Sequence, residues 1–119
     1  MNLLGKPPLG PKEKRVVSKP LRQSAAMQPC TLRLPGVCNG RLDTTVLAHI
    51  RGWGNAGISQ KPHDIHGVYA CFSCHNALDR RDRMTAGEVG FEDILRALIE
   101  TQSRMIAAGL IRVAGEATP

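Results

Sequence analysis

The chain has 119 residues and a formal net charge of +6, and aromatic residues make up 3% of it. This length fits one domain, and the scarcity of large side chains excludes an extensive aromatic core. Since no apolar run is long enough for a signal peptide or a membrane span, we expect a cytoplasmic protein without a membrane partner.

The positive charge is concentrated toward the N-terminus. Residues 1–26 carry six Lys/Arg and one Glu, for a net charge of +5, and residues 27–83 have a net charge of +3. Residues 84–119 have a net charge of −2. This asymmetry suits a polyanionic partner such as nucleic acid, although charge alone fits a soluble protein with a basic tail equally well.

The first part of the chain is predicted to be an arm followed by a short helix. Residues 1–17 contain prolines, glycines and the basic run KEKR, which is typical of a disordered segment. Ser18–Gln28 is predicted to be helical, with Ser18 as N-cap and Pro20 in the first turn. The residues expected to face the core are Leu21, Ala25 and Met27.

Two strands and a loop are predicted in the middle of the chain. Cys30–Leu34 alternates apolar and polar residues, and Thr44–Ile50 is rich in β-branched and apolar residues. Residues 51–62 have no periodicity and are predicted to form a long loop. A short apolar run, Val68–Ala70, then leads into the sequence CFSCH.

The last part of the chain is predicted to be mainly helical. Cys71–Arg81 is a short helix, and Thr85–Gly109 is a longer one with helical apolar spacing and a possible capping box at Thr85 and Glu88. Residues 110–113 are expected to form a short strand. The domain organisation that we expect is a flexible arm, a folded domain and a frayed tail at residues 1–17, 18–113 and 114–119.

Four cysteines form two pairs, Cys30 with Cys38 and Cys71 with Cys74, that lie far apart in the chain. A C-x-x-C turn directs two thiolates at one ion, and four sulfur ligands suit tetrahedral Zn²⁺. In a reducing compartment cysteines bind metal more often than they form disulfides, so we predict a closed structural zinc site. Inert buried cysteines and a disulfide are the alternative interpretations.

The histidines all lie between Leu47 and His75. His49 ends the second predicted strand, and His75 directly follows Cys74 in a predicted helix. If Cys74 faces the zinc, the next helical position points about 100° away, so His75 is available to another site. A strand that ends in His, a long loop and a CxxCH helix together form a ββα-metal pattern. His63 is interpreted as a surface residue of the loop.

The segments PGVCNG, TTVLAHIR and ACFSCHNALDRR resemble the HNH (His-Me finger) endonuclease superfamily. More narrowly, they resemble a small prophage-encoded nuclease family related to the RecA-dependent phage recombination-enhancement nuclease. The resemblance covers about residues 20–83, continues into the C-terminal helix and implies a ββα-metal (HNH) core. Together with the zinc site, the long helix and the arm predicted above, the expected fold class is α+β, with a zinc-stapled ββα-metal (HNH) core, a flanking C-terminal helix and a disordered basic N-terminal arm. It implies a metal-dependent DNA endonuclease in phage recombination, with DNA and RecA filaments as partners and no small-molecule cofactor.

The resemblance also implies roles for single residues. His49 matches the general base of the superfamily, and His75 matches a ligand of the catalytic Mg²⁺ or Mn²⁺. The middle position of the motif is usually Asn. Counting nine residues back from His75 gives His66, whereas the nearest good oxygen ligand is Asp64. We choose Asp64, and His66 stays open.

One position departs from the superfamily pattern. Many relatives have an acidic residue or His before the base as a second metal ligand, and here that residue is Ala48. The departure favours an alternative function, a non-catalytic zinc-containing DNA-binding module; a structural partner in a recombination complex is a third interpretation. Arg80 and Arg81 suit phosphate binding as well as a solvated helix end. The predicted nucleic-acid contacts are Arg51, Lys61, Arg80 and Arg81.

Overall fold

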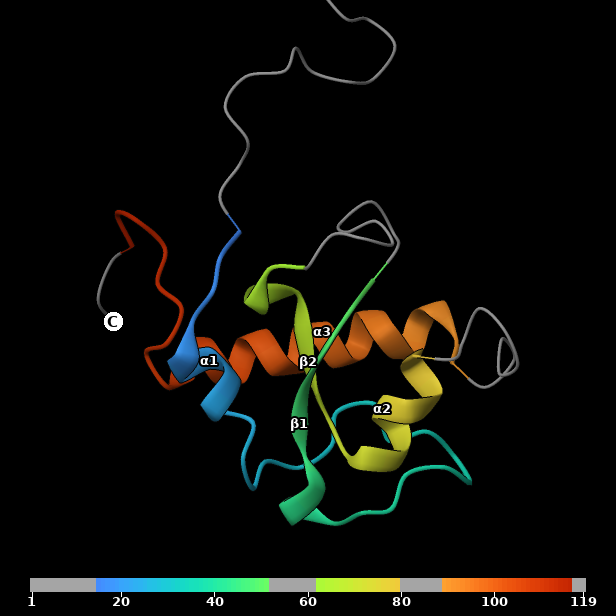
Figure 1. Cartoon of the computed structure of the whole chain (residues 1–119). Coiled ribbons are helices and arrows are strands. Elements are labelled where there is room, and N and C mark those ends of the chain that lie inside the picture. Colours follow the sequence, from blue (N-terminus) through green and yellow to red (C-terminus); the bar gives the residue numbers. More distant parts are fainter. Residues whose placement is uncertain (1–14, 52–61, 80–88, 117–119) are drawn as a thin grey trace, which may run out of the picture.

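The computed structural model describes residues 15–51, 62–79 and 89–116, which form a small α+β body (Figure 1). Its helices and strands are α1 (Lys19–Gln23), β1 (Val46–His49), β2 (Gly67–Ala70), α2 (Phe72–Asp79) and α3 (Phe91–Ala107). Short 3-10 turns lie at Leu42–Thr44 and Asp64–His66. The predicted α+β class is therefore confirmed. Within the described ranges, no helix has both the length and the apolar character needed to cross a bilayer.

The two strands form an antiparallel sheet in which Val46 lies opposite Ala70 and His49 lies opposite Gly67. Glycine is needed at this last position because a Cβ on Gly67 would meet the side chain of Leu47 at 2.7 Å. Leu47 is itself buried, so the absence of a side chain at Gly67 lets β2 pack against β1 beside His49. The sheet confirms the strand predicted to end near His49, and it shows that the run Val68–Ala70 is its partner.

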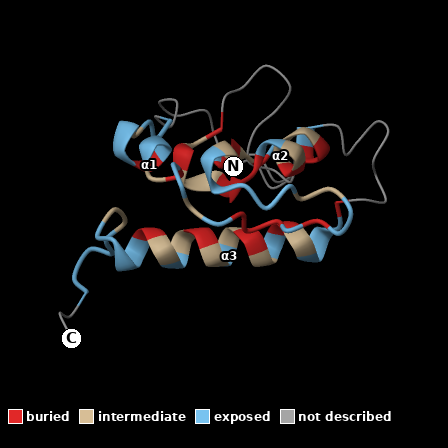
Figure 2. Cartoon of the chain, turned by 90° about the horizontal axis from the view of Figure 1, so that it is seen from below, coloured by how far each residue is buried: buried red, intermediate tan, exposed pale blue. Residues whose placement is uncertain are grey.

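Helix α3 forms one layer of the molecule, and the sheet with α1 and α2 forms the other (Figure 2). One face of α3 is buried against the sheet, and Thr101 on that face accepts a hydrogen bond from the Tyr69 backbone N–H at 3.0 Å. Helix α1 packs on the sheet through Leu21, and Ala25 in the turn after α1 belongs to the same buried cluster as Leu21 and Tyr69. The predicted core positions of Leu21 and Ala25 are confirmed.

The strand predicted at Cys30–Leu34 is wrong. Thr31 donates its backbone N–H to the Tyr69 carbonyl at 2.7 Å, but the ladder does not continue along the chain. Arg33 has a φ of +45°, and its backbone N–H points at the Cys30 sulfur at 3.5 Å. The alternating pattern therefore belongs to a turn that makes one hydrogen bond to β2, at Thr31, and directs the Arg33 N–H at a thiol.

The boundaries of two predicted helices also change. Helix α1 is shorter than Ser18–Gln28, and Met27, expected in the core, has a φ of 64° and is 60% exposed. Helix α3 begins at Phe91 rather than Thr85, and the predicted Thr85–Glu88 capping box lies outside the described residues. Gly109, with a φ of +76°, follows the end of α3, as a C-terminal glycine is expected to do.

The short strand expected at residues 110–113 is absent from this part of the described chain. The backbone N–H groups of Leu110 and Ile111 both donate back to the carbonyl of Met105, at 2.8 and 3.4 Å. These bonds cap the C-terminal end of α3. Leu110 and Ile111 therefore pack on the buried cluster that contains Leu21 instead of forming a strand.

Candidate functional site

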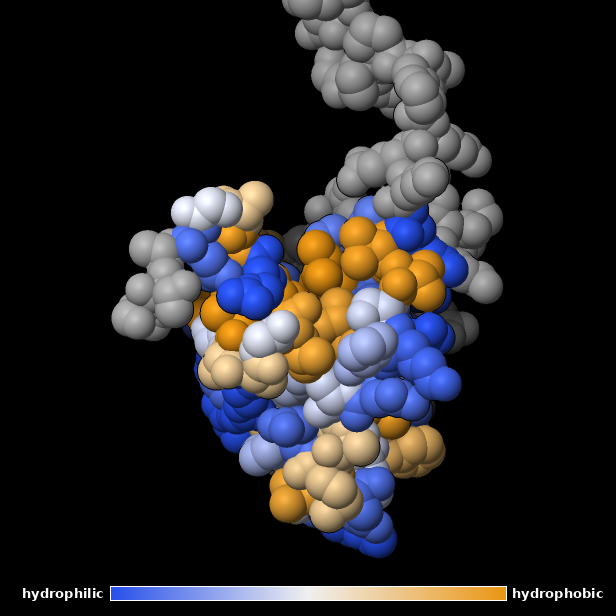
Figure 3. Space-filling view, turned by 90° about the vertical axis from the view of Figure 1, so that its left-hand side faces the viewer, coloured by the Kyte–Doolittle hydropathy of each residue, from blue (hydrophilic) through white to orange (hydrophobic). Residues whose placement is uncertain are grey.

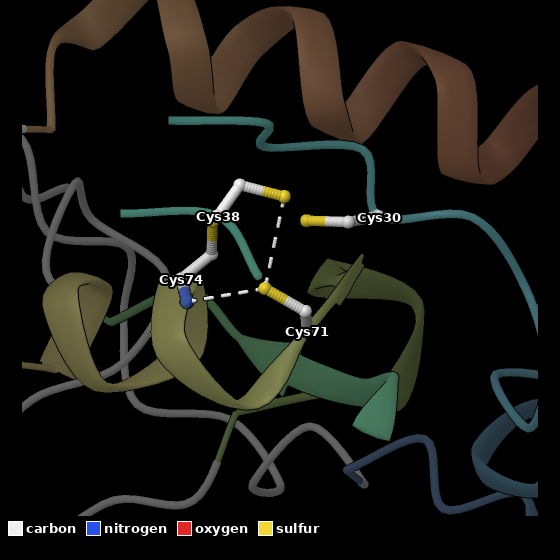
Figure 4. A group of neighbouring side chains, drawn as sticks. All are labelled: Cys30, Cys38, Cys71 and Cys74. Carbon is white, nitrogen blue, oxygen red and sulfur yellow. Dashed lines mark hydrogen bonds between the residues drawn. The ribbon is translucent and has the colours of Figure 1, made fainter. Parts of the chain in front are cut away.

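The four cysteines come together at one point beneath α3 (Figure 4). Their sulfur atoms all lie within 4.8 Å of one another, and the Sγ atoms of Cys38 and Cys71 are 3.8 Å apart. Zn–S bonds of about 2.3 Å in a tetrahedron separate the sulfurs by about 3.8 Å, so this arrangement fits one Zn²⁺. No disulfide joins the four residues. They can therefore hold one metal ion.

Backbone N–H groups surround these sulfurs. The N–H of Arg33 points at Cys30 Sγ at 3.5 Å, and the N–H of Cys74 points at Cys71 Sγ at 3.4 Å. The turn that aims the Arg33 N–H has a left-handed conformation at Arg33, with a φ of +45°, and Gly40, with a φ of +68°, directs its own N–H at Cys38. Donors directed at sulfur stabilise thiolates, which is the form that binds zinc.

The ionisation of the thiols also favours a bound cation. Burial acts to raise the pKa of Cys71, but N–H groups of Asn39 and Cys74 and the neighbouring thiols lower it to about 7. Burial and the adjacent sulfurs raise the pKa of Cys74 above its ordinary value, and burial raises that of Cys38. The raised values reflect the repulsion that neighbouring thiolates would experience, and a divalent cation among the sulfurs would compensate it.

A second group of residues meets at the end of β1. His49 Nε2 lies 2.8 Å from Asp64 Oδ1, and 26% of the His49 side chain is exposed. The two residues meet because the 3-10 turn at Asp64–His66 leads into β2, whose first residue lies opposite His49. A buried carboxylate thus contacts one ring nitrogen of a histidine that solvent can reach.

The other oxygen of Asp64 binds the N-terminal part of the chain. The Ser18 backbone N–H donates to Asp64 Oδ2 at 2.6 Å, and Arg22 Nε lies 3.4 Å from the same oxygen. Burial acts to raise the pKa of Asp64, but the Ser18 and His49 hydrogen bonds and the charge of Arg22 outweigh it. The pKa of Asp64 is therefore below its ordinary value, and the residue is a carboxylate at neutral pH.

His75 lies on α2 and faces a different carboxylate. Its Nε2 is 3.3 Å from Oδ2 of Asp79, one helical turn further along. Both side chains are accessible, with 33% of His75 and 53% of Asp79 exposed. An imidazole nitrogen and a carboxylate oxygen on one accessible helix face suit a divalent cation that keeps part of its water shell.

The structure therefore brings the four cysteines together and His49 together with Asp64, whereas His75 pairs with Asp79, a residue that the site prediction did not include. Among the described residues, the cysteines are the one set of three or more metal-ligating side chains that converge. Arg51 follows β1 and is exposed. The other predicted nucleic-acid contacts lie outside the described residues, and they are Lys61, Arg80 and Arg81.

Sequence reasoning missed the residues that hold Asp64 from the N-terminal side. The sequence predicts for Ser18 only the role of a helix cap, and Arg22 is more than 40 residues from Asp64 in the chain. A contact between residues so far apart in the chain produces no recognisable spacing pattern in the sequence. The spacing of four residues does place Asp79 on one helix face with His75, but the site prediction did not include Asp79.

Comparisons with known proteins place the chain in a family. A family model described as "Putative nuclease YbcO" matches residues 19–110. Proteins with that name from Escherichia coli (strain K12) and from Enterobacteria phage 82 are each 39% identical over 92 residues, which is 77% of this chain and 96% of the relative. A solved "putative bacteriophage protein" from Escherichia coli aligns with a TM-score of 0.60 and 38% identity, over 76% of this chain and 100% of its own. The chain therefore belongs to the YbcO family.

Proposed function

We propose that this protein is a metal-dependent DNA endonuclease of the HNH (His-Me finger) type, with His49 as the general base. The observation that carries the proposal is the 2.8 Å contact between His49 Nε2 and Asp64 Oδ1 at the end of β1. The chain order supports it as well, because a strand ending in His is followed by a return strand and a helix that bears His75. The relatives named as putative nucleases add independent support.

The contact with Asp64 determines which nitrogen of His49 can act as the base. A carboxylate only accepts hydrogen bonds, so His49 must carry its proton on Nε2 to bond Asp64. The lone pair is then on Nδ1. A neutral histidine at pH 7 can take a proton from a water molecule that attacks a phosphodiester in line with the leaving oxygen.

This geometry gives Asp64 a different role from the metal ligand that the resemblance implied. Oδ1 already contacts His49, Oδ2 accepts the Ser18 N–H and forms an ion pair with Arg22, and Asp64 is 5% exposed. We therefore propose that Asp64 orients His49 and keeps Nε2 protonated. His66 remains the other candidate for the middle position of the motif.

The catalytic cation is assigned in this proposal to His75 and Asp79. Their accessible nitrogen and oxygen atoms, 3.3 Å apart, have the chemistry of ligands for Mg²⁺ or Mn²⁺. When bound, a divalent cation neutralises charge that develops on the leaving oxygen. Ala48 is completely buried and offers no ligand, so solvent and the substrate phosphate would complete the coordination.

The remaining parts of the proposal concern the scaffold and the partners. The cysteine cluster holds a structural zinc ion, because one tetrahedral ion occupies all four sulfurs and leaves no position for substrate. DNA is the substrate, and basic side chains of the chain contact its phosphates. Those side chains are Arg51, Lys61, Arg80 and Arg81. A role in phage recombination makes RecA filaments the partner to test.

A second candidate function is a zinc-containing DNA-binding module without catalysis. It is favoured by Ala48 and by the separation of His49 and His75 into two pairs, each with its own carboxylate. In that case the two histidines would have structural roles, and the basic arm would provide the affinity for DNA.

Nicking of single- and double-stranded DNA tests the two functions against each other. The assay is run with Mg²⁺ or Mn²⁺, with and without RecA filaments, on wild type and on His49→Ala. Metal-dependent nicking by wild type that His49→Ala loses would support the nuclease. If neither protein cleaves DNA in any condition while both bind it, the DNA-binding module replaces the nuclease.

A further inference from the structure

The carboxylate that contacts His49 is held from the N-terminal side of the chain. Asp64 Oδ1 faces His49, whereas Oδ2 accepts the Ser18 N–H at 2.6 Å and lies 3.4 Å from Arg22 Nε. Asp64 is 5% exposed, so little water competes for these oxygens. The direction of the carboxylate is therefore set largely by residues other than His49.

The preceding residues are bonded to the same turn. The Val16 N–H donates to His63 Nδ1 at 2.7 Å, and the Val16 carbonyl accepts the Asp64 N–H at 2.9 Å. With the Ser18 bond, three hydrogen bonds join residues 16–18, which we call the anchoring segment, to residues 63 and 64. Although Val16 falls in the predicted flexible arm, it is part of the folded body.

Helix α1 connects the anchoring segment to the core. Leu21 is 3% exposed, and Ser24 Oγ shares a hydrogen bond of 2.7 Å with the hydroxyl of the buried Tyr69 on β2. Arg22 lies between these two contacts, with half of its side chain exposed. Figure 3 shows this side of the molecule, where apolar surface lies beside strongly hydrophilic surface. The contacts of Leu21 and Ser24 therefore hold the backbone of Arg22 in place, and its guanidinium extends to Asp64.

We propose that the anchoring segment and Arg22 are positioning elements for His49, acting through Asp64. They hold Oδ2 so that Oδ1 meets His49 Nε2, which keeps the Nε2 proton in place and leaves the Nδ1 lone pair directed away from Asp64. This inference rests on the proposed role of His49 as base. Preorganised geometry of this kind lowers the barrier of the chemical step rather than improving substrate binding.

Histidine NMR and single-turnover kinetics on full-length, zinc-loaded variants test the proposal. Nitrogen-15 spectra at about pH 8, where an ordinary imidazole is neutral, report which nitrogen of His49 carries the proton. In wild type we expect one tautomer, with the proton on Nε2. In Arg22→Ala we expect a mixture of tautomers and a cleavage rate at saturating DNA about tenfold lower, with the DNA dissociation constant within about twofold.

Matched variants separate positioning from charge and from folding. Lys19→Ala removes an exposed positive charge from the same helix and should match wild type in tautomer and rate. Arg22→Lys keeps a cation near Asp64 and should recover part of the loss. His63→Ala removes the acceptor of the Val16 N–H without touching Asp64 or Arg22, and it should shift the tautomer in the same direction as Arg22→Ala.

Two results would overturn the proposal. One is an Arg22→Ala protein with the wild-type tautomer and rate. The other is an Arg22→Ala protein whose DNA affinity falls while its rate at saturation is unchanged, which would make Arg22 a phosphate contact. A His49→Ala protein that cleaves like wild type would instead refute the proposed function. The tautomer measurement does not depend on cleavage, so the two failures are distinguishable.

Discussion

The cysteine cluster and the histidine groups are built in opposite ways. The cysteines are mostly buried, come from the segments before β1 and after β2, and converge within 4.8 Å. His49 and His75 are each partly exposed. His49 contacts the carboxylate of Asp64, and His75 contacts that of Asp79. Closed, fully ligated sites are typical of structural metals, whereas sites that bind substrate keep open positions. The difference supports the proposed division, in which the cysteine cluster has a structural role and the histidines have the chemical one.

The comparison is tested most strongly by removing a cysteine. Cys71→Ser should abolish cooperative folding or lower the melting temperature severely, because zinc binding contributes on the order of 10 kcal/mol in small metallo-domains. Zinc content and thermal unfolding measure the effect. Ser73→Ala, between the two cysteines of the same turn, is the control and should keep about one zinc per chain. A stable, zinc-free Cys71→Ser protein would contradict a structural role for the cluster.

Removing the proposed base should affect rate but leave the fold intact. His49→Ala is expected to lower single-turnover DNA cleavage by about 10²–10⁴-fold, the usual contribution of a general base. Zinc content, melting temperature and DNA affinity should stay close to wild type, because the base acts in the transition state. A variant that also lost zinc would show that the two regions are not separate.

The pair on α2 should respond to metal concentration. His75→Ala and Asp79→Asn are each expected to reduce cleavage at low Mn²⁺ by about 10–100-fold and to recover as Mn²⁺ is raised, because each removes one ligand. Titration of the rate against Mn²⁺ gives the apparent affinity of the cation. A loss that high Mn²⁺ does not relieve would assign the residue to another step. If Asp79→Asn behaves like wild type, the second ligand lies elsewhere.

The basic side chains of the arm, which precede the anchoring segment, should affect DNA binding alone. Deleting residues 1–26 would remove Leu21 and Ala25 from the core, so substitution of charges is the cleaner test. Changing Lys12, Lys14 and Arg15 to Ala should flatten the plot of log affinity against log salt by about 0.7–0.9 for each phosphate that is no longer neutralised. Glu13→Gln is the control and should not flatten it. An unchanged slope would make the arm a passive tail.

The smallest expected effect is on acid stability. The folded-state pKa of Asp64 is lowered, so its carboxylate stabilises the fold above the unfolded-state pKa of about 3.9, and this contribution is lost as pH falls through the folded value. Wild type should therefore lose more stability below about pH 4 than Asp64→Asn does. Urea unfolding at several pH values measures the difference. Parallel pH profiles for the two proteins would contradict it.

Sequence reasoning predicted the elements whose signals are local. The β-branched run before His49 and the helical apolar spacing of α3 were enough to predict that β1 and α3 exist. The reasoning failed at Cys30–Leu34, where the turn at Arg33 directs its N–H to sulfur and overrides the alternating pattern. It failed again at residues 110–113, where the chain closes the end of α3. In both places, backbone N–H groups that a strand would have bonded to a neighbouring strand form tertiary or capping hydrogen bonds instead.

The candidate site was predictable as a set of residues but not as an arrangement. The C-x-x-C spacing was enough to predict that Cys71 and Cys74 lie together, and their convergence with Cys30 and Cys38 bears out the expected grouping. The contact of Asp64 with His49 depends on the register of β1 and β2, and its contact with Arg22 depends on how α1 packs against the sheet; no spacing encodes either. The role proposed for Asp64 therefore changes from ligand to positioning residue once its neighbours are known.

The order of the cysteines along the chain has a consequence for the unfolded protein. Cys38 and Cys71 are 33 residues apart, and a zinc ion bound by both closes the intervening chain into a loop. Such a cross-link restricts the denatured ensemble much as a disulfide does, which is worth about 3–4 kcal/mol for a loop of this size. Unlike a disulfide, it withstands reducing conditions and forms again whenever zinc is available. The closed loop carries both His49 and Asp64, so zinc supply would set the fraction of molecules in which the two can meet.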